Sequence, residues 1–315
     1  MTLAHSNVVQ VASRFGILFG FVALCAYLSV ASPYFAQLDN IGNVLSQVSV
    51  NGIMAIGLTF VILSGGIDLS VGSVLALSGI VAASLVTGET AHGPAVGIAV
   101  GLLTGLAAGI VNGGVIAWSG RIPPFIVTLG MLSAARGLTQ IYNHGSQVSD
   151  LSDPFLYVGN GEWAGIQVSV YVFAVVAIVA WVALRYTRFG RYVYAIGGNE
   201  KGARTAGVNV GLIKFAVYAL CGLGAGLSGI IYTARATSAS LQAGLGYELD
   251  AIAAVVIGGT SLSGGKGGIL GTILGALLIG VINNGLDLLS VDSGNKQIIK
   301  GLVIVFAVLL DTVRR

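Results

Sequence analysis

The sequence predicts an all-α fold, a polytopic membrane helix bundle of about ten transmembrane helices, some of them interrupted. The chain has 315 residues, 55% hydrophobic and 9% charged, with a mean hydropathy of +0.92. Soluble domains carry about 25% charged residues, so a soluble fold could not bury this much apolar surface. Glycine contributes 48 residues, about twice its usual share of roughly 7%. Small residues let membrane helices pack closely and mark helix breaks that line cavities, which favours a transporter.

Apolar runs recur along the whole chain, and a helix needs about 20 such residues to cross the hydrocarbon core. In order, the predicted spans are Phe15–Ala31, Ile41–Leu63, Val71–Thr87, Pro94–Trp118, Phe125–Tyr142, Val168–Leu184, Leu212–Thr233, Leu249–Leu262, Ile269–Ser290 and Gln297–Leu310. The first run could pass for a signal peptide, but the spans after it favour an uncleaved helix. The eighth is short, so we expect a partly inserted or broken helix there. We expect a single transmembrane domain over residues 1–315.

The segment Arg185–Lys214 is the one long polar interval, and it fixes the expected orientation. It holds six of the fifteen Lys and Arg residues, and basic residues concentrate in cytoplasmic loops. Ten spans then put both termini in the cytoplasm and leave the loop Asn143–Gln167, which has no Lys or Arg, outside. The other basic residues that fall inside are Arg14, Arg121, Lys266, Arg314 and Arg315, whereas those that depart from the pattern are Arg235, Lys296 and Lys300.

A glycine pair interrupts the apolar pattern in the segment Ser64–Ser73, and Asp68 follows it. A charged residue at a helix centre costs about 2.5–3.5 kcal/mol on insertion scales. We favour Asp68 as a cap of the next helix, through backbone N–H groups; the alternative is a polar lining of the pathway. The pattern GGxxLS recurs at Gly258–Ser263, and corresponding interrupted helices in a repeat are typical of transporters.

A pathway for a neutral polyol would use uncharged side chains that hold the solute weakly. The candidates for this pathway are Asn51, Asp68, Ser70, Asn112, Asn283 and Asn284. Each asparagine could instead bond a neighbouring helix. Glu248 and Asp250 lie at the start of a span, where acids interact favourably with the helix dipole. Arg136 should face the bundle interior or extend to the membrane surface.

The sequence argues against an enzyme. It contains no HExxH, GxSxG or CxxC motif, and nothing around Asp68 and Asp250 requires an intramembrane aspartyl pair. The run Gly264–Gly268 looks like a phosphate loop but lacks the order GxxxxGK[ST], so this chain should not bind nucleotide. We expect no catalytic residues, cofactor, metal site or nucleic-acid partner.

Five segments carry a resemblance to a known family. They are Ser49–Leu77, Ile122–Thr139, Gly190–Lys214, Gly246–Gly267 and Gly275–Leu289. Through them the chain, from about Ser32 to Arg315, resembles the membrane subunits of bacterial sugar importers powered by ATP, and most of all the ribose-type permease family. The resemblance implies import of a monosaccharide across the bacterial inner membrane, with ribose as the leading candidate.

The same resemblance implies partners. Two permease subunits, identical or paralogous, would form the path, a cytoplasmic ATPase would drive it, a periplasmic sugar-binding protein would deliver the solute, and lipid would surround the bundle. Residues that resemble the cytoplasmic coupling helix of the family are Asn199, Glu200, Arg204, Gly207 and Asn209, whereas Lys201-Gly202 replaces the usual Ala-Ala. From composition alone, this basic loop could equally serve only to set the topology.

Other solutes and another energy source stay open. The solute could be an autoinducer, a nucleoside or another polyol, whereas a branched amino acid would need matching charges or helix ends along the path, of which the sequence offers few. An ion-coupled secondary transporter would need intramembrane acids, and the candidates are Asp68, Asp250 and Asp287.

Overall fold

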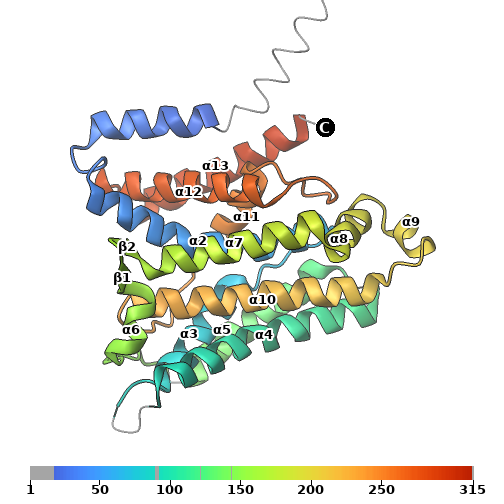
Figure 1. The fold of residues 1–315 in the computed structure, drawn as a ribbon, viewed down its shortest axis with the longest axis horizontal. Coiled ribbons are helices and arrows are strands. Elements are labelled where there is room, and N and C mark those ends of the chain that lie inside the picture. Colours follow the sequence, from blue (N-terminus) through green and yellow to red (C-terminus); the bar gives the residue numbers. More distant parts are fainter. Residues whose placement is uncertain (1–17, 89–91, 121, 143, 314–315) are drawn as a thin grey trace, which may run out of the picture.

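The structure, a computed structural model, describes residues 18–88, 92–120, 122–142 and 144–313 and confirms an all-α bundle (Figure 1). After a first helix, Leu18–Ala31, come α2 (Leu38–Leu63), α3 (Val71–Ser84), α4 (Pro94–Ser119), α5 (Pro124–Tyr142), α6 (Asp153–Asn160), α7 (Val168–Tyr186), α8 (Arg188–Gly198), α9 (Glu200–Thr205), α10 (Val210–Arg235), α11 (Tyr247–Ile257), α12 (Ile269–Leu288) and α13 (Ser293–Val313). An antiparallel hairpin, β1 (Glu162–Trp163) and β2 (Ile166–Gln167), lies between α6 and α7 and was not expected from the sequence.

A helix occupies every predicted span, although residues 15–17 of the first lie outside the described part of the chain. Five of the described helices, α2, α4, α7, α10 and α12, are long and apolar enough to cross a membrane. At 1.5 Å per residue, α3 and α11 are only about 21 and 17 Å long, short of the roughly 30 Å hydrocarbon core. The number of ten crossings therefore stays a prediction. The broken helix expected at Leu249–Leu262 is found as α11, which ends at Ile257.

Glycines allow α10 to pack closely against α4. A Cβ on Gly105 of α4 would lie 2.5 Å from the carbonyl oxygen of Gly222 on α10, and one on Gly113 would lie 2.7 Å from that of Phe215. Both distances are too short for a side chain. Close backbone approach through small residues is the usual basis of helix packing in membranes, and it accounts for part of the glycine content.

The two short helices begin inside the bundle. α3 follows the turn and irregular segment 64–70 at the end of α2, and α11 follows the turns of residues 236–246 after α10. Their first turns meet, because a Cβ on Gly72 of α3 would touch both the Gly244 carbonyl and the Glu248 carboxylate. The expectation of interrupted helices is thus confirmed at two places, and the breaks face each other.

Arg136 of α5 holds the turns that precede α11. Its Nη1 donates hydrogen bonds to the carbonyl oxygens of Leu241 and Ala243, at 2.7 and 3.0 Å. Of the two expectations for this arginine, the inward one is confirmed. The guanidinium satisfies backbone oxygens that an irregular segment would otherwise leave unpaired inside a membrane.

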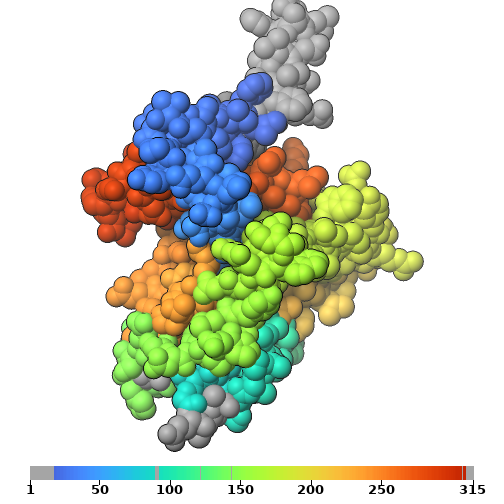
Figure 2. All heavy atoms as spheres, turned by 60° about the vertical axis from the view of Figure 1, so that its left-hand side comes forward, coloured from blue at the N-terminus to red at the C-terminus, as the bar shows by residue number. Residues whose placement is uncertain are grey.

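The two ends of the bundle differ. Figure 1 shows α8 and α9 at one end, towards which the carboxyl end of α13 also points, and α6 with the hairpin at the other. Figure 2 shows the first helix and the start of α2, in blue, against α12 and α13, in red, with α4 on the opposite side. The two GGxxLS segments lie at the same end, where Gly265 N donates to Leu63 O at 3.0 Å. The first leads through an irregular stretch directly into α3, whereas the second continues into further turns before α12 begins at Ile269.

Candidate functional site

The polar interval between α7 and α10 folds into the two short helices α8 and α9. Each of these helices, and α10 after them, begins at a side-chain cap. The side-chain oxygens of Thr187, Asn199 and Asn209 accept the backbone N–H three residues later, at 3.2, 2.9 and 3.1 Å. Such caps satisfy donors that a helix leaves open at its start. The polar residues of this loop therefore specify where each helix begins.

Glu200 joins α9 to α10. Its Oε2 accepts a hydrogen bond from Lys214 Nζ at 2.7 Å, and its Oε1 lies 3.1 Å from Arg204 Nη2. The hydrogen bond from Lys214, with a smaller contribution from Arg204, lowers the pKa of Glu200 below its usual value. The carboxylate is thus charged at neutral pH and holds α9 against α10.

The outer surface of α9 is basic. Glu200 is the only acid of the Arg185–Lys214 segment, and it is engaged internally, whereas Lys201 and Arg204 are exposed. Gly207, with φ +85°, closes the turn between α9 and α10 in a conformation that favours glycine. The structure brings all five residues of the predicted coupling segment, Asn199 to Asn209, together in and around α9.

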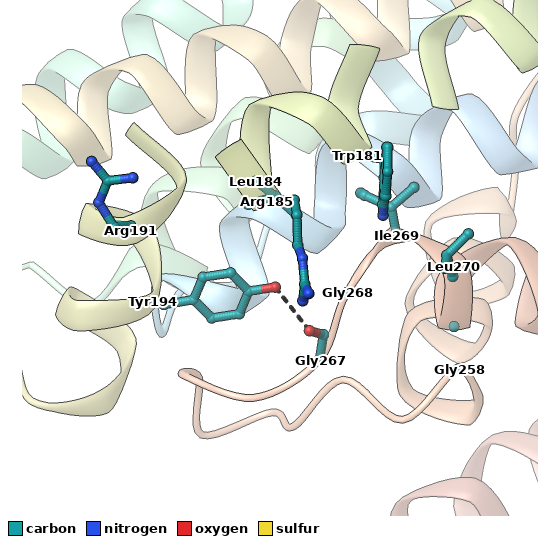
Figure 3. A pocket seen from close by; sticks show the side chains of 11 residues that line it. Trp181, Leu184, Arg185, Arg191, Tyr194, Gly258, Gly267, Gly268, Ile269 and Leu270 are labelled. Atoms are coloured by element: carbon teal, nitrogen blue, oxygen red, sulfur yellow. Dashed lines mark hydrogen bonds between the residues drawn. The ribbon is translucent and has the colours of Figure 1, made fainter. Parts of the chain in front are cut away.

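α8 lies on the loops that join the interrupted helices. Tyr194 Oη of α8 donates to the carbonyl oxygen of Gly267 at 2.9 Å, and Gly197 packs against the Leu63 carbonyl at the end of α2. A pocket of about 580 Å³ lies between α7, α8 and the start of α12 (Figure 3). α8 thus connects α9 to the end of α2 and to the loop before α12.

A buried polar network surrounds the start of α3. Asp68 Oδ1 accepts hydrogen bonds from the backbone N–H and hydroxyl of Ser70, at 2.8 and 2.6 Å. Asn112 of α4 donates to the Ser70 hydroxyl at 3.1 Å. Asp68 therefore orders the residue before α3, not the first turn of the helix that we expected it to cap. It is 1% exposed, so the network holds α3 against α4.

A second cluster of polar residues lines an open cleft of about 650 Å³ between α11, α12 and α13. Asp250 of α11 accepts hydrogen bonds from Lys300 Nζ of α13, at 2.8 Å, and from Asn283 Nδ2 of α12, at 3.2 Å. Lys296 pairs with Asp287 in the same cleft. The two lysines that depart from the charge pattern are thus neutralised by acids of the bundle. Sequence reasoning missed both pairs: it assigned Asp250 to the helix dipole and named Asp250 and Asp287 only as candidate acids of an ion-coupled transporter.

The remaining candidate asparagines lie apart from this cleft. Asn284 and Asn40 form two reciprocal amide hydrogen bonds, at 2.8 and 3.0 Å, which join α12 to α2. Asn51 is buried in α2. The six predicted pathway residues therefore divide into the network at α3, the cleft residue Asn283, Asn284 paired with Asn40, and Asn51 buried in α2. The structure places the residues, and their role in transport stays a prediction.

Comparison with known proteins gives one consistent result. Residues 40–308 match the family described as branched-chain amino acid transport system / permease component. The chain is 50% identical over 298 residues to the ribose import permease protein RbsC of Escherichia coli (strain K12), covering 93% of this chain and 92% of the relative. It is 48% identical to RbsC of Bacillus subtilis (strain 168), covering 96% and 93%, and 39% identical to the D-allose transport system permease protein AlsC of Escherichia coli (strain K12), covering 95% and 91%. No solved structure matches.

Proposed function

This chain belongs to the family described as branched-chain amino acid transport system / permease component, and from its identity to ribose import permeases we propose that it carries ribose through the inner membrane as part of an ATP-driven importer. It is the permease subunit, and ATP hydrolysis belongs to a separate chain. The observation that carries the choice of sugar is the identity to ribose import permeases, which exceeds the identity to the D-allose permease by about ten percentage points over a similar length.

The charges inside the bundle favour a neutral solute over an amino acid, whatever the family description suggests. Side chains that bind an amino acid would offer an unpaired cation to its carboxylate and an unpaired anion to its ammonium, unless helix ends take that role. In the cleft between α11 and α13, however, Asp250 pairs with Lys300 and Asp287 pairs with Lys296. Paired charges and amide groups suit the hydroxyl groups of a sugar, which donate and accept hydrogen bonds without a net charge.

In this proposal, the residues that line the cleft form one wall of the sugar path. Its volume of about 650 Å³ lies within the range of small-molecule sites, roughly 300–1,000 Å³. It is open on one side, and a second permease subunit, identical or paralogous, would close it. Asn283 is the predicted pathway residue that lines it, and Gln47 and Gln297 add amide groups. The cleft residues hold the sugar only weakly, as release demands.

α9 is the proposed coupling helix. Membership of the family implies a cytoplasmic ATPase and a periplasmic binding protein, and the exposed basic surface of α9 suits acidic side chains on the ATPase. Asn199 caps the start of α9, Asn209 caps the start of α10 that follows it, and the Glu200–Lys214 pair joins the two helices. With α9 in the cytoplasm, both chain termini would lie there too.

Uptake of labelled sugars tests the proposal. A strain that lacks this chain but keeps its ATPase should lose ribose uptake and regain it when the chain is restored, while D-allose uptake stays unchanged. A detergent pull-down of the tagged chain should recover an ATPase with vanadate-sensitive activity. Normal ribose uptake without the chain would exclude ribose, and screening of the binding protein against nucleosides, autoinducers and other polyols would follow. Loss of uptake by an uncoupler at constant ATP would instead favour an ion-coupled transporter.

A further inference from the structure

The pocket between α7, α8 and the start of α12 carries positive charge that the protein does not neutralise. Arg185 and Arg191 line it, together with Trp181 and Tyr194 (Figure 3). Among the described residues the ion pairs involve Glu200, Asp250 and Asp287, and neither arginine takes part in one. An arginine pocket without a carboxylate is suited to an anion from outside the chain.

The pocket lies at the boundary of the membrane. Arg185 is in the last turn of α7 and Ile269 is the first residue of α12, and both helices are long and apolar enough to cross a membrane. Trp181 and Tyr186 form an edge-to-face pair at the same level, with ring centroids 5.3 Å apart. Tryptophan and tyrosine concentrate where the hydrocarbon core meets the headgroups. The pocket is therefore at headgroup depth, on the side that carries α9.

The rim of the pocket is apolar. Leu270 lines the pocket and is 64% exposed. On α7, Ile178 and Val182, within two turns before Arg185, are also exposed. An anion with acyl chains could place its charged group in the pocket and its chains along these side chains. A soluble anion or an acidic protein segment would gain nothing from this apolar rim.

We propose that this pocket binds the phosphate headgroup of an anionic phospholipid. Figure 3 shows the Arg185 side chain directed towards Gly268, with Arg191 on the far side of Tyr194. Arg185 would form the two parallel hydrogen bonds that a guanidinium makes to a phosphate. The hydrogen bond from Tyr194 to Gly267 holds the wall of the pocket, and the first turn of α12, which no side chain caps, adds backbone N–H donors.

Binding would favour anionic over zwitterionic lipid, because the arginines would attract net negative charge. Each basic residue near an anionic membrane surface contributes about a fivefold preference. Bound lipid would join α7, α8 and α12 at the place where α8 meets the loop before α12. It would thus stabilise the position of α8, and with it α9, independently of the solute that the permease carries.

The test compares lipid binding by three matched arginine variants. The complete protein, in detergent and in nanodiscs, is titrated with phosphatidylglycerol and with phosphatidylcholine, and bound lipid is counted by native mass spectrometry. Arg185→Gln should weaken phosphatidylglycerol binding about fivefold and Arg191→Gln less. Arg188→Gln removes the same charge from an exposed residue of α8 that does not line the pocket, and it should change nothing. Circular dichroism confirms that each variant stays folded.

Four results would overturn the proposal. Equal binding of phosphatidylcholine would show that charge plays no part, and an equal effect of Arg188→Gln would show non-specific attraction. Competition by inorganic phosphate at low millimolar concentration would indicate a soluble anion. If Arg185→Gln reduced co-purification of the ATPase and left lipid binding unchanged, the pocket would be a contact for that partner.

Discussion

Loss of Asp250 and loss of Lys300, the two members of one ion pair, should have very different effects on the stability of the protein. The Asp250 side chain is 3% exposed and the Lys300 side chain 32%. Lys300→Met leaves a buried carboxylate whose remaining partner is the Asn283 amide. Removal of one member of a buried pair costs about 3–5 kcal/mol, because the other charge stays uncompensated.

Asp250→Asn leaves the ammonium of Lys300 instead, and that group can turn to water along the cleft. We expect Asp250→Asn to lower the free energy of unfolding by about 1 kcal/mol, the contribution of a partly exposed ion pair. The double variant Asp250→Asn with Lys300→Met has no charge to compensate and should be closer in stability to Asp250→Asn than to Lys300→Met. The order of the three variants follows from the unequal exposure of the two side chains.

Thermal unfolding of the purified protein measures this order. At about 2 °C per kcal/mol, the low end for large chains, Lys300→Met should lower the midpoint by about 6–10 °C and Asp250→Asn by about 2 °C. Asn295→Ala, in the first turn of α13 and exposed, serves as the control for changes on that helix. Equal shifts for the two single variants, or a double variant with the sum of both, would refute the reasoning.

Three further predictions concern packing and coupling. Because the pKa of Glu200 is lowered, its ion pair with Lys214 of α10 persists as pH falls and is lost only below the ordinary glutamate pKa of about 4.3. Binding of the ATPase should therefore stay constant from about pH 8 to pH 5. Glu200→Gln should weaken that binding at pH 7. Gly105→Leu should abolish insertion, measured as membrane-inserted protein, whereas Gly130→Leu, where a Cβ meets nothing, should not. Gly207→Ala should cost about 1–2 kcal/mol at its positive φ and lower coupled ATPase activity, and an unchanged activity would count against a coupling role for this turn.

The sequence set apart the polar interval between α7 and α10 by its basic residues, and the helix starts within it have local signals, whereas its role in coupling stays a prediction. Asn199 and Asn209 each stand three residues before the N–H that they cap, a spacing that is visible in a linear chain. The long helices were predictable for the same reason, since each is one uninterrupted apolar run. Boundaries moved by a few residues because helix ends depend on caps and on neighbouring elements.

The polar groups of the interior could not be assigned in this way. Asp250 and Lys300 are fifty residues apart in the chain, and no sequence pattern links an acid of one short helix to a lysine two helices later. Asn283 and Asn284 are adjacent, yet one faces the cleft and the other pairs with Asn40. Successive residues of a helix point about 100° apart, so identical side chains receive different partners.

The meeting of α3 and α11 has a consequence for how the protein is made. The first turn of α3 packs against Gly244 and Glu248, which leave the ribosome only after more than half of the chain has followed. At about 5–20 residues per second this interval is on the order of 10 s. During it, the start of α3 lacks its final neighbours inside the lipid. We therefore expect α3 to stay at the insertion machinery, or to pack temporarily against other helices, until α11 has been synthesised.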